Sequence, residues 1–108
     1  MSGLSNARGK TVDVDTAATT EEIVIVDKMG ALLGGGFSVF ISGTGRGVVK
    51  IYYKKPDGTR VEDPLMEGTK ASALLVFNYS GFVPEYEVTV TPDAVTAYEW
   101  TIESCSAA

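Results

Sequence analysis

This sequence of 108 residues contains no histidine, and Cys105 is its only cysteine. Histidine is the commonest general base in enzymes and a usual zinc ligand, so its absence argues against most nucleophilic enzymes and zinc sites. A single cysteine cannot form an intrachain disulfide, and Cys105 has no histidine beside it to activate the thiol. We therefore expect an inert thiol and no enzymatic activity.

Positive charge and long apolar runs are also scarce. Nine Lys and Arg stand against 14 Asp and Glu, which gives a formal net charge of −5. Nucleic-acid affinity depends largely on Lys and Arg, so we expect no direct contact with DNA or RNA. The apolar runs are far shorter than a membrane span, and the first residues lack a basic region followed by an apolar stretch. These absences predict no membrane contact and a chain made in the cytosol.

Two further kinds of site have only weak signals. The glycines of the segment 43–47 resemble a phosphate-binding loop, but a strand pattern follows where such a loop needs a helix. The acidic residues nearest to a calcium pattern are Asp13 with Asp15 and, separately, Glu62, Asp63 and Glu67. Their spacing matches no calcium loop, and solvated carboxylates explain them. We expect no catalytic residue, no metal and no cofactor.

The sequence does contain many short strand patterns. Its 12 Gly and five Tyr suit a β protein rich in turns, and its length predicts a single domain with a real core. The expected strands are 23–26, 37–42, 48–54, 60–62, 73–79, 86–91 and 95–103. About seven strands without a helical period predict an all-β fold, an antiparallel β-sandwich of immunoglobulin-like or jelly-roll-like type. A barrel is the alternative.

Local patterns sharpen this expectation. Pro56 to Thr59 predicts a turn, and the basic residues around it are typical of a solvent-exposed edge. Met66 to Ser72 is expected to be a loop. In the strand 86–91, Glu87 and Thr89 are expected to face water, and in the last strand Trp100 is expected in the core.

The first 22 residues differ from the rest in composition. They are rich in small and polar residues, with Val12 and Val14 as isolated apolar positions. We predict an extended arm over residues 1–22, a sandwich domain over 23–104 and a short tail over 105–108. An arm of this kind either docks on a neighbouring subunit or frays, and the sequence leaves both open.

Two of the expected strands are apolar on both faces. Phe37, Val39 and Ile41 share one face of their strand, while Phe40 stands on the other. The segment from Leu74 to Tyr79 likewise offers apolar side chains to both sides. A strand in a lone sandwich needs only one apolar face, so this surplus predicts assembly with other copies or with a partner. A three-layer or barrel-like monomer would also explain it.

Candidate contact residues follow from these patterns. The predicted interface residues are Val12, Val14, Ile23, Val24, Ile25, Val26, Phe40, Leu75 and Phe77. Tyr52 and Phe82 are candidate ligand-facing aromatics for a sugar, although packing is the usual role of aromatics on strands.

The segment from Phe37 to Glu103 resembles small β-sandwich structural proteins of tailed bacteriophages. The resemblance rests on a glycine-rich lead into the strand Phe37 to Ser42, on Gly47, Val48 and Val49 opening a strand that ends in the turn Pro56 to Thr59, and on the turn at Ser80 and Gly81 before the strand Val95 to Glu103.

Among such proteins, the resemblance is to capsid decoration or cement proteins. It implies a homo-oligomer, commonly a trimer, that contacts the major capsid protein or another virion protein on the capsid surface after assembly in the host cytoplasm. A tail, neck or head-fibre component is the alternative within the virion. A carbohydrate-binding or adhesion module is the alternative outside it.

Overall fold

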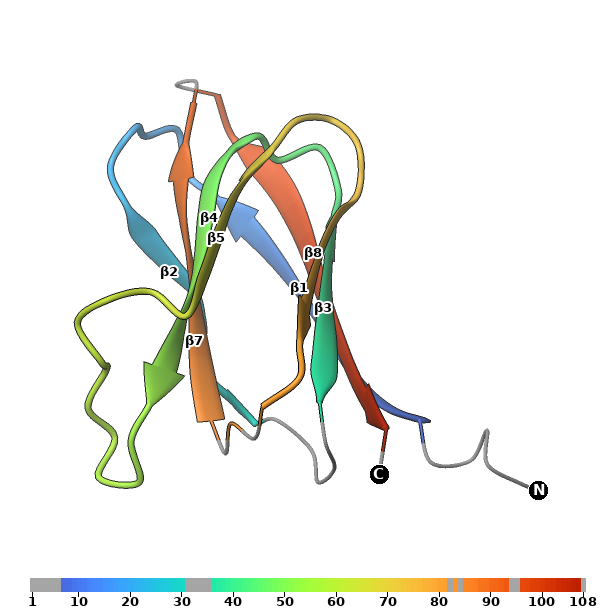
Figure 1. Cartoon of the computed structure of the whole chain (residues 1–108). Coiled ribbons are helices and arrows are strands. Elements are labelled where there is room, and N and C mark those ends of the chain that lie inside the picture. The colour runs from blue at the N-terminus through green and yellow to red at the C-terminus, as the bar shows by residue number, and fades with distance from the viewer. Residues whose placement is uncertain (1–6, 31–35, 82, 84, 94–95, 108) are drawn as a thin grey trace.

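The computed structural model describes residues 7–30, 36–81, 83, 85–93 and 96–107. These residues form an all-β fold (Figure 1). Its eight strands are β1 (Ala7–Thr16), β2 (Ile23–Gly30), β3 (Phe37–Ser42), β4 (Gly47–Lys54), β5 (Met66–Lys70), β6 (Leu75–Tyr79), β7 (Glu85–Pro92) and β8 (Tyr98–Ala107). No helix long and apolar enough to cross a membrane occurs among these residues.

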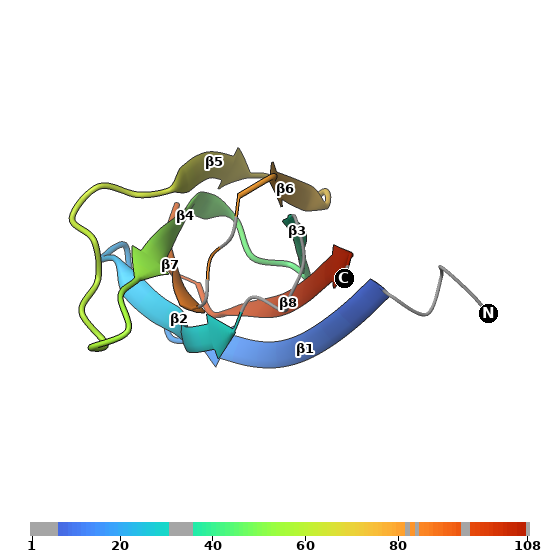
Figure 2. The same ribbon diagram turned by 60° about the horizontal axis from the view of Figure 1, so that its bottom comes forward.

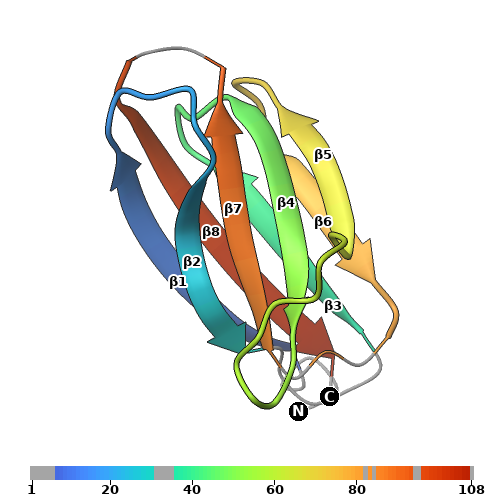
Figure 3. The ribbon, with the colours of Figure 1, turned by 90° about the vertical axis from the view of Figure 1, so that its left-hand side faces the viewer.

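The strands pair antiparallel in two sheets that pack face to face. The first sheet has the order β1-β8-β3-β6, and the second has the order β2-β7-β4-β5. Figure 3 shows the second sheet in front of the first, and Figure 2 shows β5 beside β6 where the sheets meet at one side. Only β4 and β5 are sequence neighbours within one sheet, and the other connections cross between sheets. This is the order of an eight-stranded jelly roll, so the predicted β-sandwich is confirmed in its jelly-roll form.

The core lies between the sheets and follows the alternation of the sequence. In β3, Phe37, Val39 and Ile41 are buried, while the residues between them are only half-buried. Trp100 of β8 is 1% exposed, as predicted. Burial of one large apolar side chain stabilises a fold by about 1.5–3 kcal/mol, so these inward rows account for the pairing of the two sheets.

The turn between β3 and β4 packs tightly against Trp100. Gly43 has a φ of 96°, and a Cβ atom on Gly45 would lie 2.3 Å from the Trp100 ring, which explains both glycines without a phosphate. The ammonium group of Lys70, at the end of β5, donates to the carbonyl oxygens of Gly43 (2.8 Å), Gly45 (2.6 Å) and Ala71 (3.0 Å). Lys70 is 1% exposed, and its burial lowers the pKa of the amine.

The structure corrects the expected boundaries at both ends of the chain. Residues 7–16, expected to belong to an arm, form β1 and pair with β8 from Ala7 opposite Ala107 to Thr16 opposite Tyr98. An edge strand needs apolar residues on one face only, so Val12 and Val14 suffice to seat it on the core. Residues 1–6 lie outside the described residues. Cys105, expected in a tail, lies within β8.

Two internal expectations are also wrong. Met66 to Ser72 was expected to be a loop, but Met66–Lys70 forms β5 and pairs with β4. The short strand expected at 60–62 is an isolated bridge between Lys54 and Arg60. The turn predicted from Pro56 to Thr59 is present, with a hydrogen bond from the Gly58 amide to the Lys55 carbonyl (2.8 Å).

Candidate functional site

The outer face of the first sheet carries an apolar pair that faces solvent. Phe40 of β3 and Val76 of β6 are register partners on adjacent strands. Phe40 is half-buried, Val76 is 40% exposed, and Leu74, just before β6, is 56% exposed. We call Phe40, Leu74 and Val76 the apolar patch. It is the place where the two strands predicted to be apolar on both faces meet.

The patch lies among polar groups, of which Glu103 carries a charge. Beside it on the same two strands, the Ser38 hydroxyl donates a hydrogen bond to the side-chain oxygen of Asn78. Glu103 of β8 is the register partner of Phe40 on the other side of β3. The apolar patch is therefore bounded by polar side chains on one side and ends at the β6 edge, an arrangement typical of a small contact surface.

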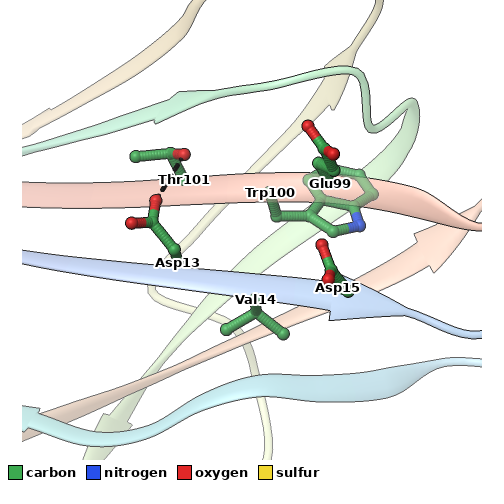
Figure 4. Close-up of a pocket in the computed structure, with 6 residues that line it drawn as sticks. All are labelled: Asp13, Val14, Asp15, Glu99, Trp100 and Thr101. Carbon is green, nitrogen blue, oxygen red and sulfur yellow. Dashed lines mark hydrogen bonds between the residues drawn. The ribbon is translucent and has the colours of Figure 1, made fainter.

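The opposite half of this outer face is acidic. Asp13 and Asp15 of β1 and Glu99 of β8 line a hollow of about 180 Å³ together with Val14, Trp100 and Thr101 (Figure 4). The Thr101 hydroxyl donates to the Asp13 carboxylate at 2.7 Å. No group of three or more His, Cys, Asp or Glu side chains in the described parts of the chain is placed to hold a metal ion. These carboxylates make this half of the face negatively charged, so it would repel another acidic surface.

The outer face of the second sheet is covered by a charge network. Lys54 of β4 lies 3.0 Å from the Asp27 carboxylate and 3.4 Å from that of Glu87. Arg60 lies 2.8 Å from the Glu87 carboxylate and 4.0 Å from that of Glu22. The hydrogen bond to Asp27 raises the pKa of Lys54, and the hydrogen bond to Glu87 raises the pKa of Arg60.

The second sheet departs from expectation at three points. Glu87 and Thr89 were expected to face water, but they are 7% and 0% exposed; Glu87 receives Lys54 and Arg60, and the Thr89 hydroxyl donates to the Glu22 carboxylate at 3.4 Å. Lys54, one of the basic residues around the turn 56–59, was expected near a solvent-exposed edge, but β4 lies between β7 and β5. Tyr52, a candidate sugar-facing aromatic, is 5% exposed because the Arg60 guanidinium covers its ring at 4.0 Å. Phe82, the second candidate, lies outside the described residues.

Most of the predicted interface residues belong to the core. Those that lie in the core or pack against it are Val12, Val14, Ile23, Ile25, Val26, Leu75 and Phe77. Val24 is 55% exposed on β2, on the far sheet from the apolar patch. Phe40 alone of these residues lies in the patch.

Sequence reasoning left Leu74 and Val76 out of the predicted interface. The alternation of side chains along β6 could have identified them. Phe77 is buried, so Leu74 and Val76, which alternate with it, must point outward. Choosing between the two apolar faces of this strand required knowing which one meets the second sheet.

No family model matches the sequence, and no curated protein matches it. Two of the solved structures that share its fold come from endospore appendages and from a prophage. One belongs to Bacillus endospore appendages, which form a family of disulfide-linked pili. It is 13% identical to this chain, and the match covers 94% of this chain and 88% of that chain with a TM-score of 0.51. The other is the SPBc2 prophage-derived protein YomS, which is 12% identical, covers 92% of this chain and 96% of that chain, and has a TM-score of 0.54. At these identities the likeness is one of fold.

Proposed function

We propose that this chain is a non-enzymatic structural subunit of a phage particle, which oligomerises and stabilises the head shell as a capsid decoration or cement protein. The observation that carries the proposal is the apolar patch of Phe40, Leu74 and Val76 on the outside of a sheet that is otherwise polar. Exposed apolar side chains that adjoin across strands are typical of a contact surface.

The shared fold supports this proposal. One structure of the same fold belongs to a prophage-derived protein, and the other belongs to pili, which are assemblies of repeated subunits. In such a role the subunit contributes by binding neighbours, and repetition over a shell adds avidity to each modest contact.

Three alternatives differ from the proposal in what they assemble or bind. A tail, neck or head-fibre component would use the same surface in an open, extended polymer. A disulfide-linked polymer of the pilus kind needs two cysteines per subunit, whereas Cys105 is the only cysteine of this sequence and can join two copies at most. The carbohydrate-binding alternative loses support because Arg60 covers Tyr52.

The test combines solution mass with electron microscopy. We expect light scattering of the purified chain to give a closed oligomer, the trimer implied by the phage resemblance or a dimer, and negative stain to show no filaments. The double variant Leu74→Ser, Val76→Ser should lower the mass. Val24→Ser should not, although Val24 is 55% exposed on the other sheet. A strict monomer at about millimolar concentration would overturn the proposal, since that is the range of effective concentrations in an assembly. Filaments would favour the tail or fibre alternative.

A further inference from the structure

Four strands of this fold end a sheet, and each must deal with unpaired backbone groups. The edge strands are β1 and β6 in the first sheet and β2 and β5 in the second. A free edge offers N–H and C=O groups to any other strand, and proteins commonly block it with charged side chains, bulges or proline.

Three of the four edges carry such a block. β1 presents Asp13 and Asp15 on its outer face, and β5 presents the exposed Glu67. β2 is broken by two register shifts against β7, and Lys28 within it has a φ of 58°, which bends the strand away from regular pairing. These three edges are poor templates for another strand.

The β6 edge carries none of these blocks. β5 of the second sheet lies beside it but does not pair with it, so among the described residues the backbone groups of this edge have no ladder partner. Its sequence, Leu-Val-Phe-Asn-Tyr, contains no charged residue, no proline and no glycine, and its register with β3 runs without a shift from Phe37 opposite Tyr79 to Ile41 opposite Leu75. Leu75 and Tyr79 point inward yet remain half-buried, as expected where the sheet stops. On the outer face the same edge presents Val76 of the apolar patch.

We propose that β6 pairs antiparallel with β6 of a second copy of this chain, which joins the two first sheets into one continuous sheet about a two-fold axis. The inference rests on the proposed function, because it names the contact through which the structural subunit assembles. Pairing through β6 places the acidic half of each first sheet at the far ends of the joined sheet. Pairing through β1 would instead set Asp13 and Asp15 of one copy beside those of the other, and like charges opposite each other destabilise a sheet.

The side chains favour a register centred on Val76. When two copies of a strand pair about a two-fold axis, the residue at the axis lies opposite the same residue of the other copy. In this register Val76 lies opposite Val76 of the second copy, and Leu75 lies opposite Phe77. The Phe40 side chains then lie one strand away on either side, so the two apolar patches form one stripe. A register centred on Asn78 would set two amides together and place Val76 opposite Ser80, which gains less from apolar contact.

A disulfide across the axis tests the pairing directly. Directly opposite residues have Cα atoms about 4.5–5.5 Å apart, which suits a disulfide. In a Cys105→Ser background, Val76→Cys should form a covalent dimer under mild oxidation at least about tenfold faster than Val24→Cys, because pairing raises the local thiol concentration. Val24 is a matched control, a valine on another edge strand with 55% exposure against 40% for Val76.

A second variant removes the pairing without removing the fold. Val76→Lys sets two like charges opposite each other on the axis, so the light-scattering mass should fall from dimer to monomer while the far-ultraviolet circular dichroism spectrum stays that of the wild type. Equal cross-linking of Val76→Cys and Val24→Cys, or an oligomer unchanged by Val76→Lys, would overturn the β6 pairing and leave the proposed function standing. A monomeric wild type would overturn both.

Discussion

At the scale of single residues, Tyr86 of β7 is a polar group placed in an apolar core. Its side chain is fully buried, and its ring stacks on Phe37 with centroids 5.2 Å apart. The Tyr86 hydroxyl lies near that of Ser104, but no hydrogen bond of good geometry joins either group to a partner within the described residues. Burial raises the pKa of Tyr86 to about 12 from its ordinary value of 10.0.

This shift predicts how stability depends on alkaline pH. Above pH 10 an unfolded tyrosine loses its proton while the folded Tyr86 keeps it, so the folded state binds more protons and stability falls as pH rises. The stabilising contribution is complete below pH 10 and is lost between pH 10 and about 12. Two pKa units correspond to about 2.7 kcal/mol.

Between pH 10 and 12, the unfolding free energy of the wild type should therefore fall by about 2–3 kcal/mol more than that of the Tyr86→Phe variant. At pH 7 the variant should be as stable as the wild type or more stable, because it removes an unpaired buried hydroxyl. Urea unfolding at each pH measures both. Equal pH slopes in the two proteins would contradict the prediction.

Lys70 supplies a second prediction, at the turn that packs on Trp100. Lys70→Met keeps the apolar stem but removes the donor for the Gly43, Gly45 and Ala71 carbonyls. Each buried polar group left unsatisfied costs about 1–3 kcal/mol, so the unfolding free energy should fall by roughly 3 kcal/mol. Urea unfolding followed by Trp100 fluorescence measures it, with the exposed Lys55→Met as the control, which should change stability by less than about 0.5 kcal/mol.

At the scale of elements, the charge network fastens the segment after β4 onto the second sheet. Glu87 of β7 receives both Lys54 and Arg60, and its side chain is 9% exposed. Asp27, which also receives Lys54, is 56% exposed. The same lysine therefore has one buried and one exposed partner, which permits a matched comparison.

Glu87→Gln should destabilise the fold more than Asp27→Asn. The first leaves Lys54 and Arg60 without their buried counter-charge, at a cost of about 2 kcal/mol after allowing for the exposure of Arg60. The second removes an exposed ion pair worth less than about 1 kcal/mol, and salt should screen it. Thermal unfolding at low and high salt measures both. A larger loss for Asp27→Asn would show that the buried pairing is not what holds the segment.

The elements also show where sequence patterns suffice and where they fail. The strands β3, β4, β7 and β8 were predictable because alternating apolar residues meet the core from one side. β5 was missed because its short segment, Met-Glu-Gly-Thr-Lys, has one apolar side chain and buries a lysine that needs a tertiary partner. The burial of Glu87 was missed for the same reason, since its cations come from other segments.

At the scale of the whole molecule, the sequence indicated that apolar surface remains outside. Phe40 is half-buried on the outer face of β3, and its part in an interface stays a prediction. The sequence could not separate the interface from the core at Leu75 and Phe77, because an alternating strand with two apolar faces is symmetric until the second sheet is placed. The arm was misassigned for a related reason. β1 and β8 lie at opposite ends of the sequence, with Ala7 opposite Ala107. Because the paired residues are so far apart in the sequence, no local pattern indicates that they pair.

The place of β1 in the first sheet changes what an N-terminal deletion should do. Removing residues 1–16 takes away the strand that pairs with β8 over its whole length and the Thr16 hydroxyl that accepts a hydrogen bond from the Trp100 indole at 3.1 Å. It also uncovers core that Val12 and Val14 pack against. We therefore expect unfolding to lose its cooperativity and the protein to aggregate, because the deletion exposes apolar core and the whole backbone edge of β8.

A deletion of residues 1–6 retains β1 and should keep the wild-type unfolding midpoint. Circular dichroism and Trp100 fluorescence on heating distinguish the two deletions. If the chain lacking residues 1–16 instead unfolded cooperatively near the wild-type temperature, β1 would be dispensable for the fold and free to act as the docking arm that its composition suggested. The structure predicts the opposite, because β1 supplies one edge of the first sheet and part of the cover over Trp100.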